Sequence, residues 1–189
     1  MRKDFGKTNW LVPQPVMIVT SYDERGIPNA MNAAWGGIYD EHKVMICLAT
    51  DHKTTMNLYH TNEFAICFPT SKHVVEADYV GIVSGNEVRN KFDKLNLTIT
   101  KSKLVNAPII EEFPIALECR ISSIQEVDVG TTIVIGDVLN TSVDKSMLDY
   151  SGKVDSEKFD FIAYDPINHK YRKIGKEIAD AFICGLEIK

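Results

Sequence analysis

VMIVTSYDERGIPNAMNAAWGGIY, residues 16–39, places two β-rich runs on either side of a polar turn. Residues 16–21 are apolar and largely β-branched, which is typical of a strand. Residues 23–26, DERG, supply turn chemistry, and residues 29–39 resume as a strand. The stretch therefore predicts a β-hairpin at the start of the fold.

Further strand signals follow this hairpin along the chain. Residues 44–49 and 64–68 are apolar and strand-like, and Pro69 ends the second run. Residues 115–127 and 131–143 are long β-rich runs separated by residues 128–130, which predicts a second hairpin. We expect residues 150–189 to be strand and loop that close the structure.

The helical signals are few and short. Residues 52–61, HKTTMNLYHT, are compatible with a short helix that has Asp51 as its expected N-cap. Residues 71–83 are also expected to be helical, until Ser84 and Gly85 break the pattern. A short helical turn is expected around residues 90–95.

These elements predict a β-dominated α+β fold, a barrel with a few peripheral helices. Residues 1–189 contain no internal repeat or linker, so a single domain is expected. The regular strand–helix alternation of a dinucleotide-binding fold is missing, and GIVSG at residues 81–85 lacks the GxGxxG spacing. A Rossmann domain for NAD is therefore disfavoured.

The charge and composition narrow the class of partner. Lys and Arg number 21 against 26 Asp and Glu, a net charge of -5, so neither nucleic acid nor an anionic membrane is expected as a partner. No apolar stretch is long enough for a membrane helix, and residues 1–10 lack the apolar region of a signal peptide. The four cysteines form no CxxC pair and are expected to be buried thiols of a cytoplasmic protein.

The first candidate binding segment is NAMNAAW, residues 29–35. Its amides alternate with small residues that let a flat ligand approach the backbone, and Trp35 adds an aromatic surface. Asn side chains and strand amides offer both donors and acceptors, which the pyrimidine edge of an isoalloxazine requires. The alternative for residues 29–35 is an ordinary edge strand with a packed Trp.

The second and third candidate segments are ATDHKTT, residues 49–55, and GIVSG, residues 81–85, which is followed by NKF at residues 90–92. Helix N-terminal amides, Thr hydroxyls and a Lys ammonium are the donors that a phosphate normally finds. Asp51 would compete for those amides if it capped the helix, and a plain capped surface helix is the alternative. For the third segment the alternative is a helix C-cap with a solvated lysine.

Together these segments resemble the FMN-binding flavin reductase-like family, the flavoredoxin group of split β-barrels. The landmarks occur in family order: PQPV (13–16), N-A-M-x-x-x-W, T-x-H-K-T-T, G-x-x-S-G with a following K-F, I-G-D-V (135–138) and Y-R-x-x-G (171–175). One departure is visible, because many relatives carry a His where this chain has Thr131.

The resemblance implies an FMN site made of three groups of residues. Asn29, Met31, Asn32, Ala33 and Trp35 would line the isoalloxazine, and Tyr164 would add an aromatic wall. The phosphate segment would contribute Thr50, His52, Lys53, Thr54 and Thr55, with Ser84 and Lys91 completing the site. The resemblance also implies a homodimer with the flavin near its interface.

The leading functional hypothesis is an FMN-dependent oxidoreductase that passes electrons from a reduced donor, with NAD(P)H as the candidate, to a flavin or another acceptor. The first alternative is an electron carrier that docks to redox proteins without turnover of its own. The second is a split barrel that binds haem, against which the phosphate segment speaks. The scattered histidines and the isolated Ser84 predict neither a metal site nor a nucleophilic triad.

Overall fold

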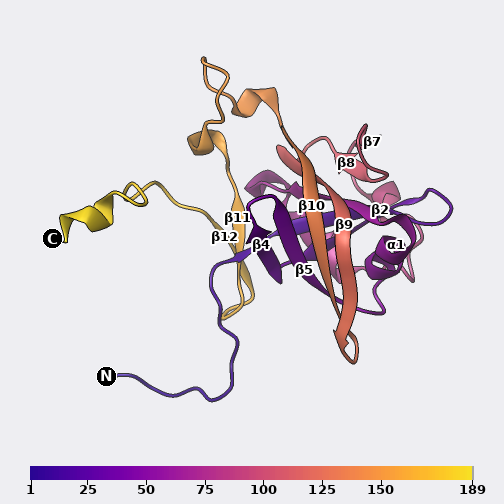
Figure 1. The fold of residues 1–189 in the computed structure, drawn as a ribbon, viewed down its shortest axis with the longest axis horizontal. Helices are drawn as coiled ribbons and strands as arrows, with labels where there is room; N and C mark the ends of the chain where they lie inside the picture. The colour runs from indigo at the N-terminus through magenta and orange to yellow at the C-terminus, as the bar shows by residue number, and fades with distance from the viewer. Residues whose placement is uncertain (189) are drawn as a thin grey trace.

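Seven strands form the main sheet, in the order β3-β2-β6-β9-β10-β5-β4, in a computed structural model that describes residues 1–188 (Figure 1). Every pairing in this sheet is antiparallel. The strands are β2 (Met17–Tyr22), β3 (Pro28–Ala33), β4 (Gly36–Asp40), β5 (Lys43–Ala49), β6 (Glu63–Phe68), β9 (Ile115–Asp128) and β10 (Thr131–Val143).

The first predicted hairpin is present as β2 and β3, which pair from Met17 with Ala33 to Tyr22 with Pro28. The turn between them follows the predicted chemistry. Asp23 accepts hydrogen bonds from the backbone N–H groups of Arg25 and Ile27, both at 2.8 Å. Such an Asx turn satisfies amides that the hairpin itself leaves unpaired.

The expectation of one strand over residues 29–39 was wrong. The chain breaks at residues 34–35, so that β3 lies at one edge of the main sheet and β4 at the other. Gly36 explains part of this break, because a Cβ there would lie 2.4 Å from the backbone oxygen of Met45. The close approach lets β4 pair with β5 directly after the break. The single run of residues 28–40 therefore supplies both edge strands of the main sheet.

The second predicted hairpin, β9 with β10, is also present, with three register irregularities along its length. Such irregularities bend and twist a long hairpin, which lets it curve around the core. Two small sheets complete the strands of the described residues. They contain β1 (Gln14–Pro15), β11 (Ile162–Asp165) and β12 (Lys170–Lys173) in one, and β7 (Ile99–Lys101) and β8 (Pro108–Ile110) in the other. Of these strands, β7 and β8 were not predicted.

Two α-helices accompany the strands where helices were predicted: α1 (Lys53–Thr61) and α2 (Val74–Ile82). The N-cap assignment was wrong, because His52 and not Asp51 occupies that position, and no side chain caps the helix within the described residues. The 3-10 turns within residues 1–188 are η1 (Ser71–His73), η2 (Lys91–Lys94), η3 (Lys145–Met147), η4 (Ser156–Lys158) and η5 (Cys184–Glu187).

The core divides into two main clusters on the two sides of the sheet. One fills the barrel around Phe64, Ile46 and Leu58. The other packs α2, through Ala77 and Val80, against β2 and β11. This second cluster holds α2 at a fixed place beside β3, which matters for the site below.

The cysteines follow the prediction only in part. Cys67 and Cys119 are buried, and burial raises the pKa of each thiol to about 12. Cys47 is half-buried. The prediction was wrong for Cys184, which is exposed.

Both ends of the chain leave the body as extended arms (Figure 1). We call residues 1–13 the N-terminal arm and residues 174–188 the C-terminal arm. The segment 150–189 was expected to close the structure, but only β11 and β12 do so, and the residues after Gly175 are exposed as far as they are described. No helix within residues 1–188 is long and apolar enough to cross a membrane.

Candidate functional site

A cavity of about 190 Å³ lies where the three predicted binding segments meet. Strand β3 contributes one wall, the start of α1 a second, and the end of α2 with the following turn a third. The predicted residues that line it are Asn29, Met31, His52, Lys53, Thr54, Ser84 and Lys91. Segments that are up to 62 positions apart in the sequence thus converge on one site.

The floor of this cavity is a hydrogen bond between two buried side chains. The Asn29 Nδ2 atom donates to Thr54 Oγ1 at 2.7 Å, and the two residues are 4% and 1% exposed. This bond ties β3 to the first turn of α1. Because Thr54 accepts this bond, its own hydroxyl proton can be donated to a ligand in the cavity.

Thr55 has a different role from its neighbour. Its hydroxyl donates to the backbone oxygen of Ala49 at 2.7 Å and is fully buried, so its proton is committed within the chain. Thr50 is likewise engaged, with its Oγ1 atom 2.9 Å from that of Thr132. Both residues shape the approach to α1 without lining the cavity.

The N-terminus of α1 faces this cavity with its backbone amides uncapped by side chains of the described residues. The first turn contains no acidic residue, and Lys53 stands at its first position. Unpaired N–H groups and the positive end of a helix dipole attract an anion. The competition expected from Asp51 therefore does not arise.

Two glycines allow the third wall of the cavity, the end of α2 with its following turn, to approach β3 and α1 closely. A Cβ on Gly85 would lie 2.5 Å from Asn29 Oδ1 and 3.0 Å from Lys53 Cβ. A Cβ on Gly81 would lie 2.9 Å from Asn32 Cβ. Glycine at these two positions therefore permits α2 and its following turn to touch β3 and α1. From the sequence, Gly85 was expected to end the helix or to form its C-cap, and no signal within the motif indicated which residues it would contact.

Ser84 lies in the turn between these walls and is exposed. Its Oγ accepts from the backbone N–H of Asn86 at 3.2 Å, and Asn86 Nδ2 in turn donates to the backbone oxygen of Asp51 at 3.0 Å. The turn is thereby fastened to the loop that precedes α1. The arrangement keeps the third wall in place against the second.

Lys91 is the buried charged group of the cavity lining and is 3% exposed. Its Nζ donates to the backbone oxygens of Ala30 and Val80, both at 2.8 Å, which links β3 to α2. An ammonium carries three protons, so one remains for a ligand. Burial lowers the pKa of Lys91 to about 8. The alternative of a solvated lysine is therefore excluded.

The other predicted residues lie outside the cavity lining. Side chains alternate along a strand, and Asn32 faces away from the cavity, donating to the Ala77 backbone oxygen at 3.2 Å and to Tyr171 Oη at 3.1 Å. Ala33 is buried in the barrel core. Trp35 is 62% exposed between β3 and β4. Tyr164 lines a separate cavity of about 300 Å³.

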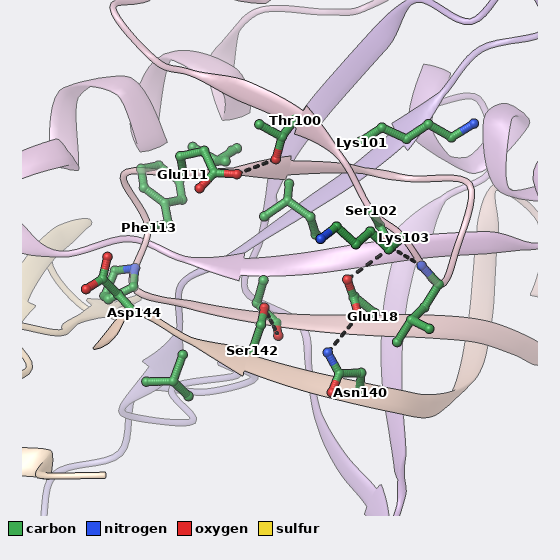
Figure 2. A pocket seen from close by; sticks show the side chains of 16 residues that line it. Thr100, Lys101, Ser102, Lys103, Glu111, Phe113, Glu118, Asn140, Ser142 and Asp144 are labelled. Carbon is green, nitrogen blue, oxygen red and sulfur yellow. Dashed lines mark hydrogen bonds between the residues drawn. The ribbon is translucent and has the colours of Figure 1, made fainter. Parts of the chain in front are cut away.

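A larger cavity of about 490 Å³ lies between the β7–β8 hairpin and strands β9 and β10 (Figure 2). Its buried carboxylate, Glu118, accepts from Ser102 Oγ at 3.0 Å and from Asn140 Nδ2 at 2.8 Å. Glu111 and Asp144 add two further acidic side chains to the lining. Its three acidic side chains outnumber the lysines Lys101 and Lys103, so this surface suits a phosphate less well than the smaller cavity does, and it contains none of the predicted residues. We therefore take the smaller cavity as the candidate site.

Comparison with known proteins places this geometry in context. The model of a family described as "Flavin reductase like domain" matches residues 10–158. Flavoredoxin of Desulfovibrio vulgaris (Miyazaki F) superimposes with a TM-score of 0.91 at 33% identity, over 98% of this chain and 100% of that chain. The predicted β-dominated split barrel is thereby confirmed.

Two more distant structures show the same fold. Flavoredoxin from Methanosarcina acetivorans has a TM-score of 0.89 at 22% identity, with 100% of both chains covered. An FMN-binding protein from Thermus thermophilus has a TM-score of 0.76 at 17% identity, over 95% of this chain and 99% of that chain. At these identities the likeness concerns the fold alone.

Proposed function

The chain belongs to the family of flavin reductase-like domains, and from this premise we propose that it is an oxidoreductase that binds FMN and passes electrons through it. The observation that carries the proposal is the uncapped N-terminus of α1, which faces a cavity that also holds the Thr54 hydroxyl and the buried Lys91 ammonium. These are the kinds of donor that suit a phosphate.

The residues present fit the phosphate end of FMN. The amides of α1, the Thr54 hydroxyl and the cations of Lys53 and Lys91 would hold the phosphate, and Ser84 lies within the same lining. The cavity is smaller than the roughly 300–1,000 Å³ that usually encloses a whole ligand of this size. The ring would therefore lie beyond it, along β3 toward Met31 and the exposed Trp35.

The chemistry comes from the cofactor, because bound FMN can accept a hydride and release electrons singly or in pairs. The protein would bind FMN, orient it and shield it from solvent. Asn29 fixes Thr54, Gly85 allows the wall of the site to close, and Lys91 supplies a buried positive charge near the ligand. No residue of the cavity needs to act as an acid or base.

A second candidate is an electron carrier that docks to redox proteins, and the 33% identity to a protein named flavoredoxin favours it. The two proposals differ in turnover. An enzyme with NAD(P)H as donor oxidises NADH or NADPH when the holoprotein is supplied with an acceptor. A carrier leaves both nicotinamides unchanged and exchanges electrons only with a protein.

We also propose that the protein is a homodimer that works in the cytoplasm. The shallow cavity supports the first part, since a second copy would supply the missing cover for the ring. The buried thiols of Cys67 and Cys119 support the second, because unpaired buried cysteines suit a reducing compartment.

The test of the proposed function is the identity of the flavin that the protein takes up. We expect purified protein to show flavin absorption bands, either as isolated or after incubation with FMN, and to release FMN on denaturation. FAD should bind more weakly, because the cavity has room for one phosphate and not for a second nucleotide. A colourless protein that FMN does not reconstitute would contradict the proposal.

A further inference from the structure

Both arms carry large apolar side chains that their own chain leaves uncovered. Phe5 and Leu11 of the N-terminal arm are 60% and 73% exposed, and Ile178 and Phe182 of the C-terminal arm are 99% and 98% exposed. Among the described residues, the backbone hydrogen bonds made after Ile174 all stay within the C-terminal arm. Clustered apolar exposure of this kind usually marks a surface that a partner covers.

The two arms leave the body from one small sheet. The N-terminal arm ends where β1 begins, and the C-terminal arm begins where β12 ends, and both strands flank β11. Figure 1 shows the arms extending away from the body on the same side of the view. A single neighbouring molecule could therefore be reached by both arms. In a two-fold pair each copy would both give and receive them.

Charge distinguishes the N-terminal arm from the rest of the chain. It contains Arg2, Lys3 and Lys7 against the single acid Asp4, in a chain whose net charge is -5. Its two aromatic rings, Phe5 and Trp10, pack on one another with centroids 5.0 Å apart. The arm thus presents an apolar and basic surface, which requires an apolar and acidic counterpart.

Strand β4 offers a surface of that kind. It is an edge strand of the main sheet, and Ile38 and Tyr39 on it are 89% and 55% exposed. Asp40 ends the strand, and Glu41 follows it in the turn. The nearby Lys43 is paired with Asp137 at 2.7 Å, so it does not neutralise the turn fully. An open edge with exposed apolar side chains is a surface that proteins normally cover.

We propose that the N-terminal arm of one copy of this chain binds across β4 of a second copy, with its apolar side chains on Ile38 and Tyr39 and its cations facing Asp40 and Glu41. Trp35 precedes β4 and is also exposed, so the arm would cover the residue that is expected to line the flavin ring. This consequence for the flavin rests on the proposed function, whereas the pairing of the arm with β4 does not.

The direct test is a cross-link between two differently substituted chains. Cys184→Ser first removes the exposed thiol. Chains carrying Phe5→Cys are mixed with chains carrying Ile38→Cys, allowed to exchange, and oxidised. We expect a disulfide-linked product that contains one chain of each kind. Val129→Cys, at an exposed hairpin tip, replaces Ile38→Cys in the control and should give only background linkage.

Two outcomes would overturn the proposal. One is a link formed within a single chain that carries both substitutions, without any link in the mixture, because the arm would then cover its own β4. The other is no link in either sample. FMN uptake is measured separately on the same proteins, so a failure to bind FMN leaves this test intact.

A charge swap tests the proposed attraction between the cations of the N-terminal arm and the acidic side chains of Asp40 and Glu41. Arg2→Glu, Lys3→Glu and Lys7→Glu together should raise the dissociation constant of the pair at least about tenfold at low salt. Asp40→Lys with Glu41→Lys should then restore it. Lys72→Glu, Lys94→Glu and Lys103→Glu, an equal charge change at other exposed positions, is the control. A monomeric parent protein, or a swap that fails to restore pairing, would overturn the assignment.

Discussion

Thr54 and Thr55 are neighbours in the chain, yet their hydroxyls face different partners. Thr54 lines the cavity and accepts from Asn29, whereas Thr55 donates to Ala49 inside the chain. A hydrogen bond to a charged group contributes about 1.5 to 3 kcal/mol. Thr54→Ala should therefore weaken FMN binding about tenfold or more, while binding of riboflavin, which lacks the phosphate, should change little.

Thr54→Ser is the matched control, since it keeps the hydroxyl and should keep most of the affinity for FMN. Equilibrium titration of each apo variant with FMN and with riboflavin measures the difference. Equal losses for both ligands in Thr54→Ala would mean that the phosphate is not held at the start of α1.

Gly85 is required by close approach and not by its backbone angles. Gly85→Ala would place a methyl group 2.5 Å from Asn29 Oδ1 and 3.0 Å from Lys53 Cβ, so the wall of the site must move. We expect weaker FMN binding, together with a loss of stability of about 1–3 kcal/mol, which is typical of overpacking. Gly185→Ala, in the C-terminal arm, meets nothing within 4 Å and is the control in the same titration and denaturation experiments.

The buried Lys91 makes FMN binding sensitive to pH. Burial lowers the pKa of Lys91 to about 8, so the apo protein loses this charge as the pH rises through that value. A bound phosphate favours the charged form and must then restore the proton. The affinity for FMN should therefore fall as the pH rises from about 7 to 9, a range in which an ordinary lysine remains charged.

Riboflavin is the control ligand for this profile, because it places no phosphate near Lys91. Lys91→Met should flatten the pH dependence of FMN binding as well as weaken it. A profile for FMN that stays level across this range in the unmodified protein would show that Lys91 does not face the phosphate.

Among the secondary-structure elements, α1 lacks a side-chain N-cap hydrogen bond within residues 1–188, which lowers the stability of the helix but leaves its N-terminal amides free to bind a phosphate. His52 sits at the N-cap with extended backbone angles that suit a capping side chain, but it makes no such bond. His52→Asp should cap the helix and stabilise the apo protein by about 0.5–2 kcal/mol. The same carboxylate would occupy the amides and repel the phosphate, so FMN affinity should fall.

His52→Ser separates the two effects, because a serine caps without a charge. It should stabilise the helix with a smaller loss of FMN affinity than His52→Asp. Chemical denaturation of the apo proteins measures their free energies of unfolding, and titration with FMN measures their affinities for it. If His52→Asp binds FMN as tightly as the parent, the helix N-terminus is not the anion site.

Elements were predictable from the sequence where periodicity and turn chemistry agreed. The β2–β3 hairpin has both signals, and so does the long β9–β10 pair. The break between β3 and β4 was not predictable, because it depends on a contact of Gly36 with Met45 that lies on another strand. Short β7 and β8 were missed because three-residue strands carry too little pattern.

The candidate site divides in the same way. The three segments and most of their polar residues could be named from spacing and from the family resemblance. The side chains that face the cavity could not be named in this way, because their orientation depends on strand alternation and on tertiary hydrogen bonds. Asn32 and Thr55 were chosen by type, but their partners are Tyr171 and Ala49 within the chain. Asp51 was expected to cap α1, and one residue of displacement leaves that cap empty.

At the scale of the whole molecule, binding at the cavity should stabilise the fold. A ligand that binds only the native state at 100 times its dissociation constant adds about 2.7 kcal/mol. FMN should therefore raise the melting temperature of the apo protein more than riboflavin does at the same concentration. Calorimetry of the parent and of Thr54→Ala checks this, and an equal shift with both flavins in the parent would contradict a phosphate site.

A crystal structure of the protein with FMN would test the proposed phosphate site most directly. We expect the phosphate to lie within hydrogen-bond distance of Thr54 Oγ1 and of the first amides of α1, with the ring extending toward Met31 and Trp35. A phosphate bound elsewhere, such as in the larger cavity beside Glu118, would contradict it.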